Sequence, residues 1–462
     1  MFRKFTNGCV HLVNRFLPDP FIFCIILTVV VFIAAIPATG ALSQEQGVLQ
    51  LLENGWAGGV WNLLAFSMQM ALVLVLGSAL ANAPIVKKII SAIAGIATTP
   101  KNAIIVVTGV SVIASWLNWG FGLVVGAILA KEVARKVKGA DYRLLIASAY
   151  GGFVIWHAGF SGSIPLTMAT DLGDGMFTVG GYTHEIVPIS QTIFSPWNLI
   201  MCAIILVVLP LLMAKAHPSP EETLCIDPKL LEEEEVVYKK PETPAEKVEN
   251  SVILSYIIVV AGVVSLVLYF IHNGANISLN TVNFIFLIVG IAAHKTPVAY
   301  VHAVESAAKG AAGIILQFPF YAGIMGMMVF TFKDADGFAT SDSLASVISE
   351  FFVSISNRVT FPLFTFLSAG IVNFFVPSGG GQWAVQGPIM MPAGEALGVD
   401  TAITGMSIAW GDSWTNMIQP FWALPALGIA GLSARDIMGY CIISLVLTGI
   451  VVCGGFVIIG LI

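Results

Sequence analysis

Long apolar runs that follow one another from end to end constrain this chain more than any other feature. Only 10% of its 462 residues are charged, whereas soluble domains carry roughly 25%. Many of the runs approach the roughly 20 residues that a helix needs to cross a bilayer. They are continuous rather than alternating between apolar and polar residues, which disfavours a β-barrel. We therefore expect an all-α polytopic membrane protein whose solvent is the lipid bilayer.

Charge is concentrated in one segment rather than spread over the chain. Residues 215–250 hold ten of the 27 acidic and five of the 21 basic residues. The remainder is nearly neutral, so we expect no nucleic-acid partner. The six cysteines are scattered without metal-ligand spacing, and no GxxxxGK[ST] loop for ATP occurs. We therefore expect no cofactor and no enzyme activity.

Two halves of the chain carry similar features in the same order. We expect a first transmembrane repeat over 1–214, a charged cytoplasmic linker over 215–250, a connecting span over 251–272 and a second repeat over 281–462. Broken apolar segments at matching places in two halves are typical of secondary transporters. The matching pairs include Asn118–Gly122 with Asn373–Gly381, Ala140–Asp141 with Val399–Asp400, and Ala149–Gly151 with Ala409–Gly411.

Basic residues indicate which ends of the predicted spans face the cytoplasm. The N-terminus, the 131–143 segment and the linker are rich in them, so we place all three in the cytoplasm. This orientation makes 103–138 a re-entrant hairpin that enters from the cytoplasmic side, and 361–397 a hairpin that dips from the outside. The single connecting span between the halves inverts the orientation of the second repeat in the membrane. We expect about nine spans plus two opposed re-entrant hairpins, with broken helices meeting near the midplane.

Four interruptions of the apolar runs carry the candidate binding residues. Residues 116–122, 157–165, 376–382 and 411–420 hold mostly neutral donors and acceptors, with glycines that let backbone N–H groups approach a solute. Irregular backbone at membrane depth is tolerated only where it is buried in protein or lines a cavity. Helix N-termini behind such breaks suit a carboxylate, and half-helix C-termini suit Na⁺. The substrate- or ion-binding candidates are Asn118, Gly120, Gly122, Ser161, Ser163, Asn373, Ser378, Gly379, Gly380, Gly381, Gln382, Asp412, Ser413, Asn416 and Gln419.

Asp412 is the only carboxylate in the four interruptions. An ionisable residue at membrane depth is costly, which makes it a functional candidate. It could carry a coupling proton or ligate a cation, such as Na⁺ bound near Asn118 and Asp412. The alternative is that Asp412 caps a half-helix begun by Ser413. His157 could be a second proton site, although a hydrogen-bonded packing role is favoured for it.

No lysine or arginine occurs in the four interruptions. A multiply charged anion would need fixed countercharge, so this composition favours a small monoanion whose apolar tail faces Trp119, Phe121, Trp383 or Trp414. The residues alone predict a secondary carrier for a small anionic solute, coupled to H⁺ or Na⁺ and working by alternating access. A channel or facilitator, which would show no uphill accumulation, and a membrane enzyme are the alternatives.

Motifs along the whole chain resemble one family of carriers. They are Leu17–Pro20, Val60–Phe66, Asn118–Gly126, Asp227–Leu231, Val376–Gly381 and Gln419–Pro425. With them the chain resembles the bacterial short-chain fatty acid transporter family, which is grouped with the ion transporter superfamily. The resemblance implies uptake of short-chain fatty acids such as acetoacetate and butyrate across the bacterial inner membrane. Because dicarboxylate carriers of the superfamily are homodimers with two opposed hairpins, it also implies a homodimer.

The chain departs from those dicarboxylate carriers at both predicted hairpin tips. Their Ser-Asn-Thr signature is absent, because Trp119 follows Asn118 and Gly379 follows Ser378. This departure weakens the case for their sodium sites and for their substrate. Transport of another small organic anion, such as a dicarboxylate, is therefore the less favoured alternative.

The predicted topology can be tested by cysteine labelling in a cysteine-free background. A cysteine at position 378 should react with an impermeant maleimide added outside in at least one state, whereas a cysteine at position 119 should react from the cytoplasmic side. The opposite pattern of accessibility would invert the topology.

Overall fold

The computed structural model describes residues 2–16, 20–170, 175–179, 182–225, 242–273 and 279–462, and most of these are helical. The all-α membrane fold expected from the sequence is confirmed. Within the described ranges, seven helices are long and apolar enough to cross a membrane, or eight if one bent pair counts as a span. About nine spans were predicted, in addition to the two hairpins. The predicted spans 281–293 and 401–424 are shorter helices, α13 (Leu279–His294) for the first and α19 (Thr401–Thr415) with α20 (Pro420–Ala430) for the second, whereas the seven long helices include α6 (Pro100–Leu117), which was predicted as a hairpin arm. Residues 226–241 of the linker, which include the 227–231 motif, lie outside the described residues.

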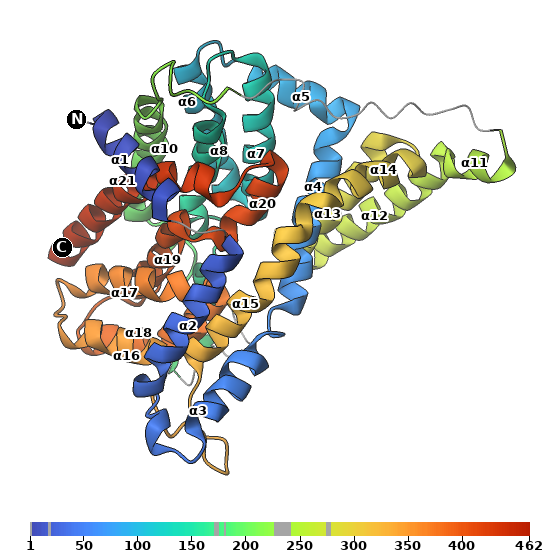
Figure 1. The fold of residues 1–462 in the computed structure, drawn as a ribbon. Coiled ribbons are helices and arrows are strands. Elements are labelled where there is room, and N and C mark those ends of the chain that lie inside the picture. The colour runs from blue at the N-terminus through green and yellow to red at the C-terminus, as the bar shows by residue number, and fades with distance from the viewer. Residues whose placement is uncertain (1, 17–19, 171–174, 180–181, 226–241, 274–278) are drawn as a thin grey trace.

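The helices form two groups that lie side by side in Figure 1. The smaller group contains α4, and α13 is tied to it because Gln69 donates to Asn280 at 2.7 Å and His294 contacts the Ala79 carbonyl at 2.8 Å. The larger group contains the four interruptions, and α15 runs between the two groups. The smaller group and its attachments are α4 (Leu64–Asn82), α5 (Pro84–Ala94), α11 (Pro244–Glu249), α12 (Val252–Asn273), α13 (Leu279–His294), α14 (Pro297–Ala308), η5 (Lys309–Ala311) and α15 (Ala312–Val329).

The N-terminal elements line one side of the larger group. An amphipathic helix packs along the last helix, where a side chain at Gly439 would meet the Val10 backbone at 2.5 Å. The next helix runs beside α15 (Figure 1). These elements are α1 (Phe2–Phe16), α2 (Pro20–Ala38), η1 (Ala41–Ser43), α3 (Gly47–Gln50), a π-helical segment η2 (Leu51–Ala57), and the last helix α21 (Ala434–Leu461).

The first predicted hairpin is built from α6 (Pro100–Leu117) and α7 (Trp119–Lys136), which meet at Asn118. Asn118 adopts an extended conformation, and its side chain accepts a hydrogen bond from the Phe121 N–H at 3.0 Å. An asparagine in this position satisfies one of the free N–H groups at a helix start. Because the two arms are packed closely, a Cβ at Gly122 would lie 2.5 Å from the Ser115 Cα.

The second predicted hairpin repeats this design in α17 (Phe361–Phe375) and α18 (Gly379–Ala396). Ser378 occupies the place of Asn118, and its hydroxyl accepts from the Gly381 N–H at 3.3 Å. Inside the hairpin, Gln382 donates to the Ala369 carbonyl at 3.0 Å and to Gln386 at 2.6 Å. Polar side chains thus connect the two arms by hydrogen bonds. Van der Waals packing of apolar side chains alone would fix the relative position of two membrane helices less specifically.

Each hairpin is followed by an aspartate-capped broken helix. Asp141 accepts from the Leu144 N–H at 2.9 Å, and Asp400 accepts from the Ala402 N–H at 2.8 Å. The two halves therefore share an order of elements, while the inverted relation between them stays a prediction. The first set is α8 (Tyr142–Gly151), η3 (Gly152–Ala158), α9 (Ser163–Met168) and α10 (Pro196–Lys215), and the second is α19 (Thr401–Thr415), η6 (Asn416–Ile418), α20 (Pro420–Ala430) and α21.

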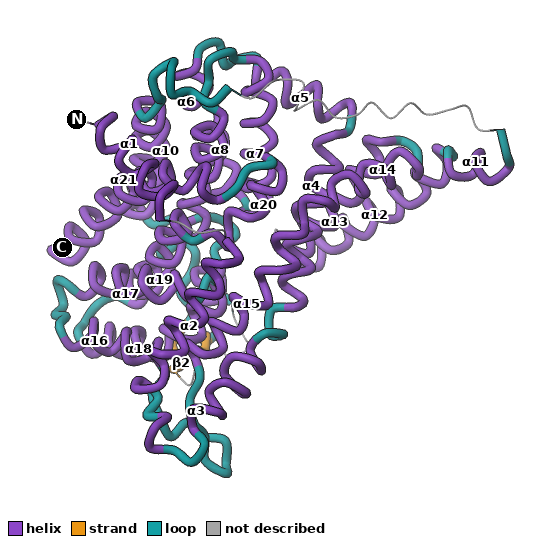
Figure 2. The backbone as a smooth tube through the Cα atoms, in the orientation of Figure 1, coloured by secondary structure: helices purple, strands orange, loops and turns teal. Residues whose placement is uncertain are grey.

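A small β-hairpin lies against α18 in a region that the sequence indicates only as polar. It consists of antiparallel β1 (Met176–Val179) and β2 (Tyr182–Glu185), and Figure 2 shows β2 beside α18. Tyr182 donates to the Glu395 carboxylate at 3.0 Å. Burial, together with this hydrogen bond, raises the pKa of Tyr182 to about 12, so its hydroxyl remains a donor. α16 (Leu344–Ser354) packs against both arms of the second hairpin.

The close packing of the first hairpin predicts the effect of adding one methyl group. Gly122→Ala would force the new Cβ against backbone atoms of Ser115, and overpacking of this kind costs roughly 1–3 kcal/mol. We expect a clear fall in the thermal unfolding midpoint in detergent. Gly109→Ala is the matched control, because nothing lies within 4 Å of a Cβ at Gly109. Equal midpoints for the two variants would contradict this account of the packing.

Candidate functional site

The centre of the candidate site is a buried pair formed by His157 and Asp412. The His157 Nδ1 lies 2.8 Å from the Asp412 Oδ2, and both side chains are completely buried (0% exposed). His157 belongs to η3 and Asp412 to the last turn of α19, so the two halves of the chain each supply one partner. The sequence identifies both residues as proton-site candidates but does not indicate that they meet.

The surroundings of His157 determine where its proton resides. The Ile164 N–H donates to the His157 Nε2 at 3.1 Å, so Nε2 is an acceptor and carries no hydrogen. The proton of a neutral ring is then on Nδ1 and points to the Asp412 carboxylate. This assignment makes the pair a neutral imidazole that donates to a carboxylate.

The second oxygen of Asp412 has no partner among the described residues. Asp412 Oδ1 is buried without a hydrogen bond, as are the nearby Asn373 Oδ1 and Asn416 Nδ2. An unsatisfied charged oxygen away from water is strongly unfavourable. The structure therefore contains a buried acceptor suited to a proton, a cation or a polar ligand.

The alternative prediction, that Asp412 caps a half-helix begun by Ser413, is wrong. Helix α19 continues through Thr415, and the Ser413 hydroxyl contacts the Trp410 carbonyl of its own helix at 3.2 Å. The predicted break over 411–420 is therefore limited to residues 416–419. Gly411 does not break the helix; it allows close packing, because a Cβ there would lie 2.3 Å from the Phe366 carbonyl oxygen.

Asn373 fixes the end of α19 beside the pair. Its Nδ2 lies 2.6 Å from the Asp412 carbonyl, 2.9 Å from the Thr415 hydroxyl and 2.9 Å from the Asn416 Oδ1. Two hydrogens cannot satisfy three acceptors fully, so the amide is shared among them. Tyr150 donates to the Asn416 carbonyl from α8, which connects this corner to the first half.

The N-terminus of α18 lies directly against the histidine. A Cβ at Gly379 would be 2.9 Å from the His157 Cε1, 2.9 Å from the Trp156 ring and 3.1 Å from the Ser163 hydroxyl. At Gly380, by contrast, nothing lies within 4 Å of such an atom, and this residue is exposed. Gly381 faces Met325 at 3.3 Å. Of the three glycines, Gly380 therefore marks open space at the positive end of a helix dipole.

The N-terminus of α7, in the other hairpin, lies beside Trp156, the residue that precedes His157. The Trp119 N–H donates to the Ser161 hydroxyl at 2.9 Å, and the Trp119 ring lies 6.3 Å from Trp156 and 5.2 Å from Trp422. Trp156 stacks on His157 at 4.1 Å. Both predicted hairpin tips thus border a common aromatic group of Trp119, Trp156 and Trp422.

Other candidate residues have different surroundings. Gln419 caps α20 by accepting from the Phe421 N–H at 2.5 Å, and Gln382 lies within the second hairpin. Gly120 is buried in the first turn of α7, and Gly122 packs against α6. Trp414 donates to the Leu445 carbonyl at 2.7 Å and contacts Phe366. Trp414 therefore packs beside α17 and α21, away from the pair, contrary to the expectation that it could face the solute.

Sequence reasoning missed several polar residues that support the site. Asn198 accepts from the Trp410 N–H at 2.9 Å and donates to the Ala158 carbonyl at 3.1 Å, which holds η3 next to α19. Tyr150 has a similar bracing role, and Gln386 extends the polar chain in the second hairpin. A polar side chain inside an apolar run is the signal that could identify all three. The described residues include no group of three histidine, cysteine or acidic side chains that could hold a metal ion.

Comparisons by sequence match this chain over nearly its whole length. A family model described as "Short chain fatty acid transporter" matches residues 1–459. A protein of Escherichia coli (strain K12) is 45% identical over 454 residues, 98% of each chain, and one of Haemophilus influenzae is 46% identical over 453 residues, 97% of this chain and 98% of that one. Both bear the name "Putative short-chain fatty acid transporter". The crystal structure of the Alcanivorax borkumensis YdaH transporter covers 96% of this chain and 98% of its own, with 17% identity and a TM-score of 0.43.

The role of Asn373 predicts a marked loss of stability when its amide is removed. Asn373→Ala would remove the donor that the Asp412 carbonyl, the Thr415 hydroxyl and the Asn416 Oδ1 share, and an unsatisfied buried group costs roughly 1–3 kcal/mol. We expect a fall in the unfolding midpoint measured by thermal shift in detergent. Asn62→Ala is the control at an exposed asparagine and should change little. A variant at position 373 as stable as this control would argue against the bracing role.

Proposed function

Because this chain belongs to the short chain fatty acid transporter family, we propose that it takes up small monocarboxylates such as acetoacetate and butyrate by secondary active transport. Transport itself follows from the family. The substrate class, the coupling and the mechanism are the proposal. The observation that carries it is the buried Asp412 Oδ1 without a hydrogen-bond partner, close to the open N-terminus of α18.

The substrate carboxylate binds at the start of α18. Gly380 is exposed with open space beside it, and the start of a helix attracts anions through the helix dipole and through hydrogen bonds from its first N–H groups. No lysine or arginine lies in the four interruptions, so these neutral donors suit one negative charge better than two. Trp156 and Trp119 supply apolar surface for a short tail. A dicarboxylate fits this composition less well.

The coupling ion neutralises Asp412. A substrate carboxylate at α18 and an ionised Asp412 would repel one another in a low-dielectric surrounding. A proton on Asp412 Oδ1 removes this repulsion and satisfies the buried oxygen at the same time. Binding of substrate therefore favours binding of the proton, and the reverse holds by thermodynamic linkage. Na⁺ is the second option, and it would need further oxygen ligands around Asp412.

Alternating access would expose this site to each side in turn. The two hairpins flank Trp156, and the opposite directions of entry inferred from charge would let each one gate a different side. We place the carrier in the bacterial inner membrane with its N-terminus in the cytoplasm, and we expect it to work as a homodimer.

Uptake by purified protein in liposomes tests the coupling. Labelled acetoacetate is added with an inward proton gradient, an inward Na⁺ gradient or neither, and uptake by protein-free liposomes is subtracted because protonated short-chain acids cross bilayers unaided. We expect protein-dependent accumulation above the outside concentration with the proton gradient. Equilibration without accumulation in every arm would indicate a facilitator, and accumulation driven by Na⁺ alone would exclude the proton.

Replacing Asp412 separates coupling from binding. Asp412→Asn keeps the shape of the side chain but cannot exchange a proton, so gradient-driven uptake should fall at least about tenfold, while exchange of internal for external substrate is retained. Asp400→Asn is the matched control, because asparagine still caps α19. Wild-type accumulation by Asp412→Asn would eliminate this acid as the coupling group.

A further inference from the structure

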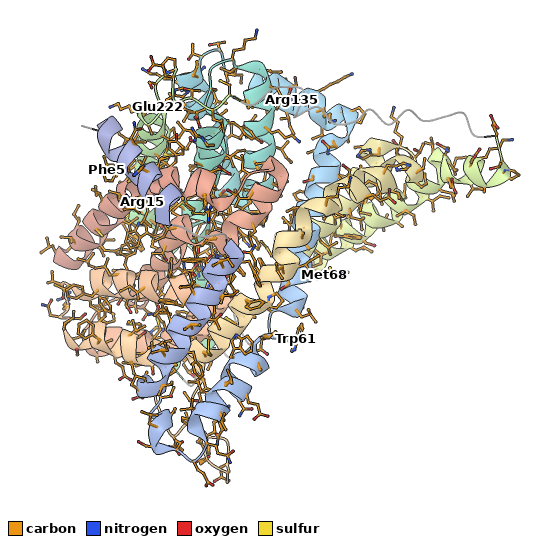
Figure 3. All side chains as sticks on the ribbon, in the orientation of Figure 1. Phe5, Arg15, Trp61, Met68, Arg135 and Glu222 are labelled. Atoms are coloured by element: carbon orange, nitrogen blue, oxygen red, sulfur yellow. The ribbon has the colours of Figure 1, made fainter. Side chains whose placement is uncertain are left out.

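An apolar groove lies between α6 and α10, two helices that pack side by side in the larger group (Figure 1). Ile155 of η3 contributes to its base. The groove has a volume of about 230 Å³, and its lining consists of aliphatic side chains together with the Cys202 thiol and the Trp116 ring. The exposed apolar residues Trp61 and Met68, by contrast, project outward from the edge of the smaller group (Figure 3). The groove is therefore a recess in the apolar surface of the protein, with room for a ligand.

The groove runs along a helix that is long enough to cross the bilayer. α10 begins at Pro196 and is 20 residues long, which corresponds to about 30 Å, the thickness of the hydrocarbon core. The lining residues Leu199 and Leu206 lie about 5 Å and about 15 Å along the helix from Pro196, at 1.5 Å per residue. The groove is therefore about 10 Å long and lies in the half of the hydrocarbon region that is nearer to the start of α10.

The rim of the groove is exposed and its base is buried. Ile113 on α6 is 53% exposed and Leu199 on α10 is 38% exposed, whereas Ile155 and Cys202 are only 2% and 7% exposed. An apolar side chain that is exposed within a membrane-crossing segment contacts lipid. The groove therefore opens sideways into the bilayer, and lipid chains can enter it directly.

Aromatic residues gather at the end of the groove that is nearest to the start of α10. The Trp116 ring lies 4.7 Å from the Phe160 ring and 6.1 Å from the Phe194 ring, and Phe194 precedes α10 by two positions. Tryptophan is enriched where the hydrocarbon core meets the lipid headgroups. A chain that lies in the groove therefore runs from the headgroup level at Trp116 inward to Leu206.

We propose that this groove binds one acyl chain of a membrane lipid. An apolar cavity of about 150 Å³ binds benzene, so the 230 Å³ of the groove holds roughly nine carbon atoms in proportion. The acyl chain of a phospholipid supplies a run of methylene groups of that length, whereas a four-carbon acid would fill less than half of the space. The lining residues include no cation, and a carboxylate buried among them would lack a partner, which is strongly unfavourable. Size and polarity thus favour a lipid chain over a short acid.

The bound chain packs against the segment that carries His157. Ile155 precedes His157 by two positions in η3, and Asn198 of α10 already holds the end of η3 through the Ala158 carbonyl at 3.1 Å. Each carbon of the chain adds van der Waals contacts with η3, α6 and α10. The lipid chain thereby increases the stability of the place where these three elements meet.

Filling the groove with a protein side chain tests the proposal. Ala203 lines the groove, so Ala203→Phe places an aromatic ring where the chain would lie. The delipidated full-length protein is titrated with dioleoyl phosphatidylcholine, and retained lipid is counted by native mass spectrometry. We expect Ala203→Phe to bind at least about tenfold more weakly than the wild type, because the loss of several buried methylene groups costs about 0.8 kcal/mol for each one. Ile204→Phe is the matched control, since Ile204 is the next residue, is 41% exposed and lies outside the lining; its binding should change less than twofold.

The native Cys202 thiol reports on occupancy of the groove. In a variant whose only cysteine is Cys202, the lipid should slow the reaction with N-ethylmaleimide at least about fivefold, while butyrate at the same concentration should not. A variant whose only cysteine is Cys453 on α21, outside the lining, should react at the same rate with and without lipid.

Three outcomes would overturn the proposal. Equal binding of lipid by Ala203→Phe and Ile204→Phe would mean general contact with lipid rather than a site. Protection of Cys202 by butyrate but not by the lipid would assign the groove to a short acid. If Ala203→Phe fails to fold, equal reaction rates at Cys202 with and without lipid would by themselves exclude a bound chain.

Discussion

The buried contact between His157 and Asp412 is the interaction on which the centre of this structure depends. Each partner is supplied by a helix that is broken or ends nearby, and neither would be tolerated alone at this depth. Removing one member of such a pair strands a polar or charged group, which usually costs about 3–5 kcal/mol. The contacts of Ile164, Asn373 and Gly379 all hold this pair or pack against it. The contact between His157 and Asp412 thus stabilises the same broken helices that hold the two side chains in place.

The two halves use the same local devices with different residues. A short polar cap starts the second arm of each hairpin, with Asn118 in one and Ser378 in the other, and an aspartate starts each broken helix. This correspondence does not extend to the titratable pair. Its histidine, His157, lies in the first half, and its carboxylate, Asp412, lies in the second. The pair is therefore composite, and neither half alone contains it.

Much of this architecture is visible in the sequence because its signals are local. Apolar run length indicates the membrane helices, and the residues around Asn118 and Ser378 mark both hairpin tips, since caps and glycines act within a few positions. The contact between His157 and Asp412 spans 255 positions and depends on tertiary packing that no local pattern records. The helix break predicted at Gly411 is wrong for the same reason. A glycine that breaks a helix and a glycine that allows a close approach to Phe366 cannot be distinguished in a sequence. The short strands β1 and β2 gave too weak a pattern to predict.

The hydrogen bond from the Ile164 N–H to His157 affects the net charge that the proposed transport cycle would move across the membrane. Because Nε2 accepts from a backbone N–H, a second proton on the ring would have to displace that hydrogen bond. In the proposed mechanism the pair would therefore hold a single proton, on Asp412. A carrier that moved one monocarboxylate with that proton would transfer no net charge, so the membrane potential would neither drive nor oppose uptake. The accumulation it could sustain would be set by acidity alone, at about tenfold for each pH unit across the membrane.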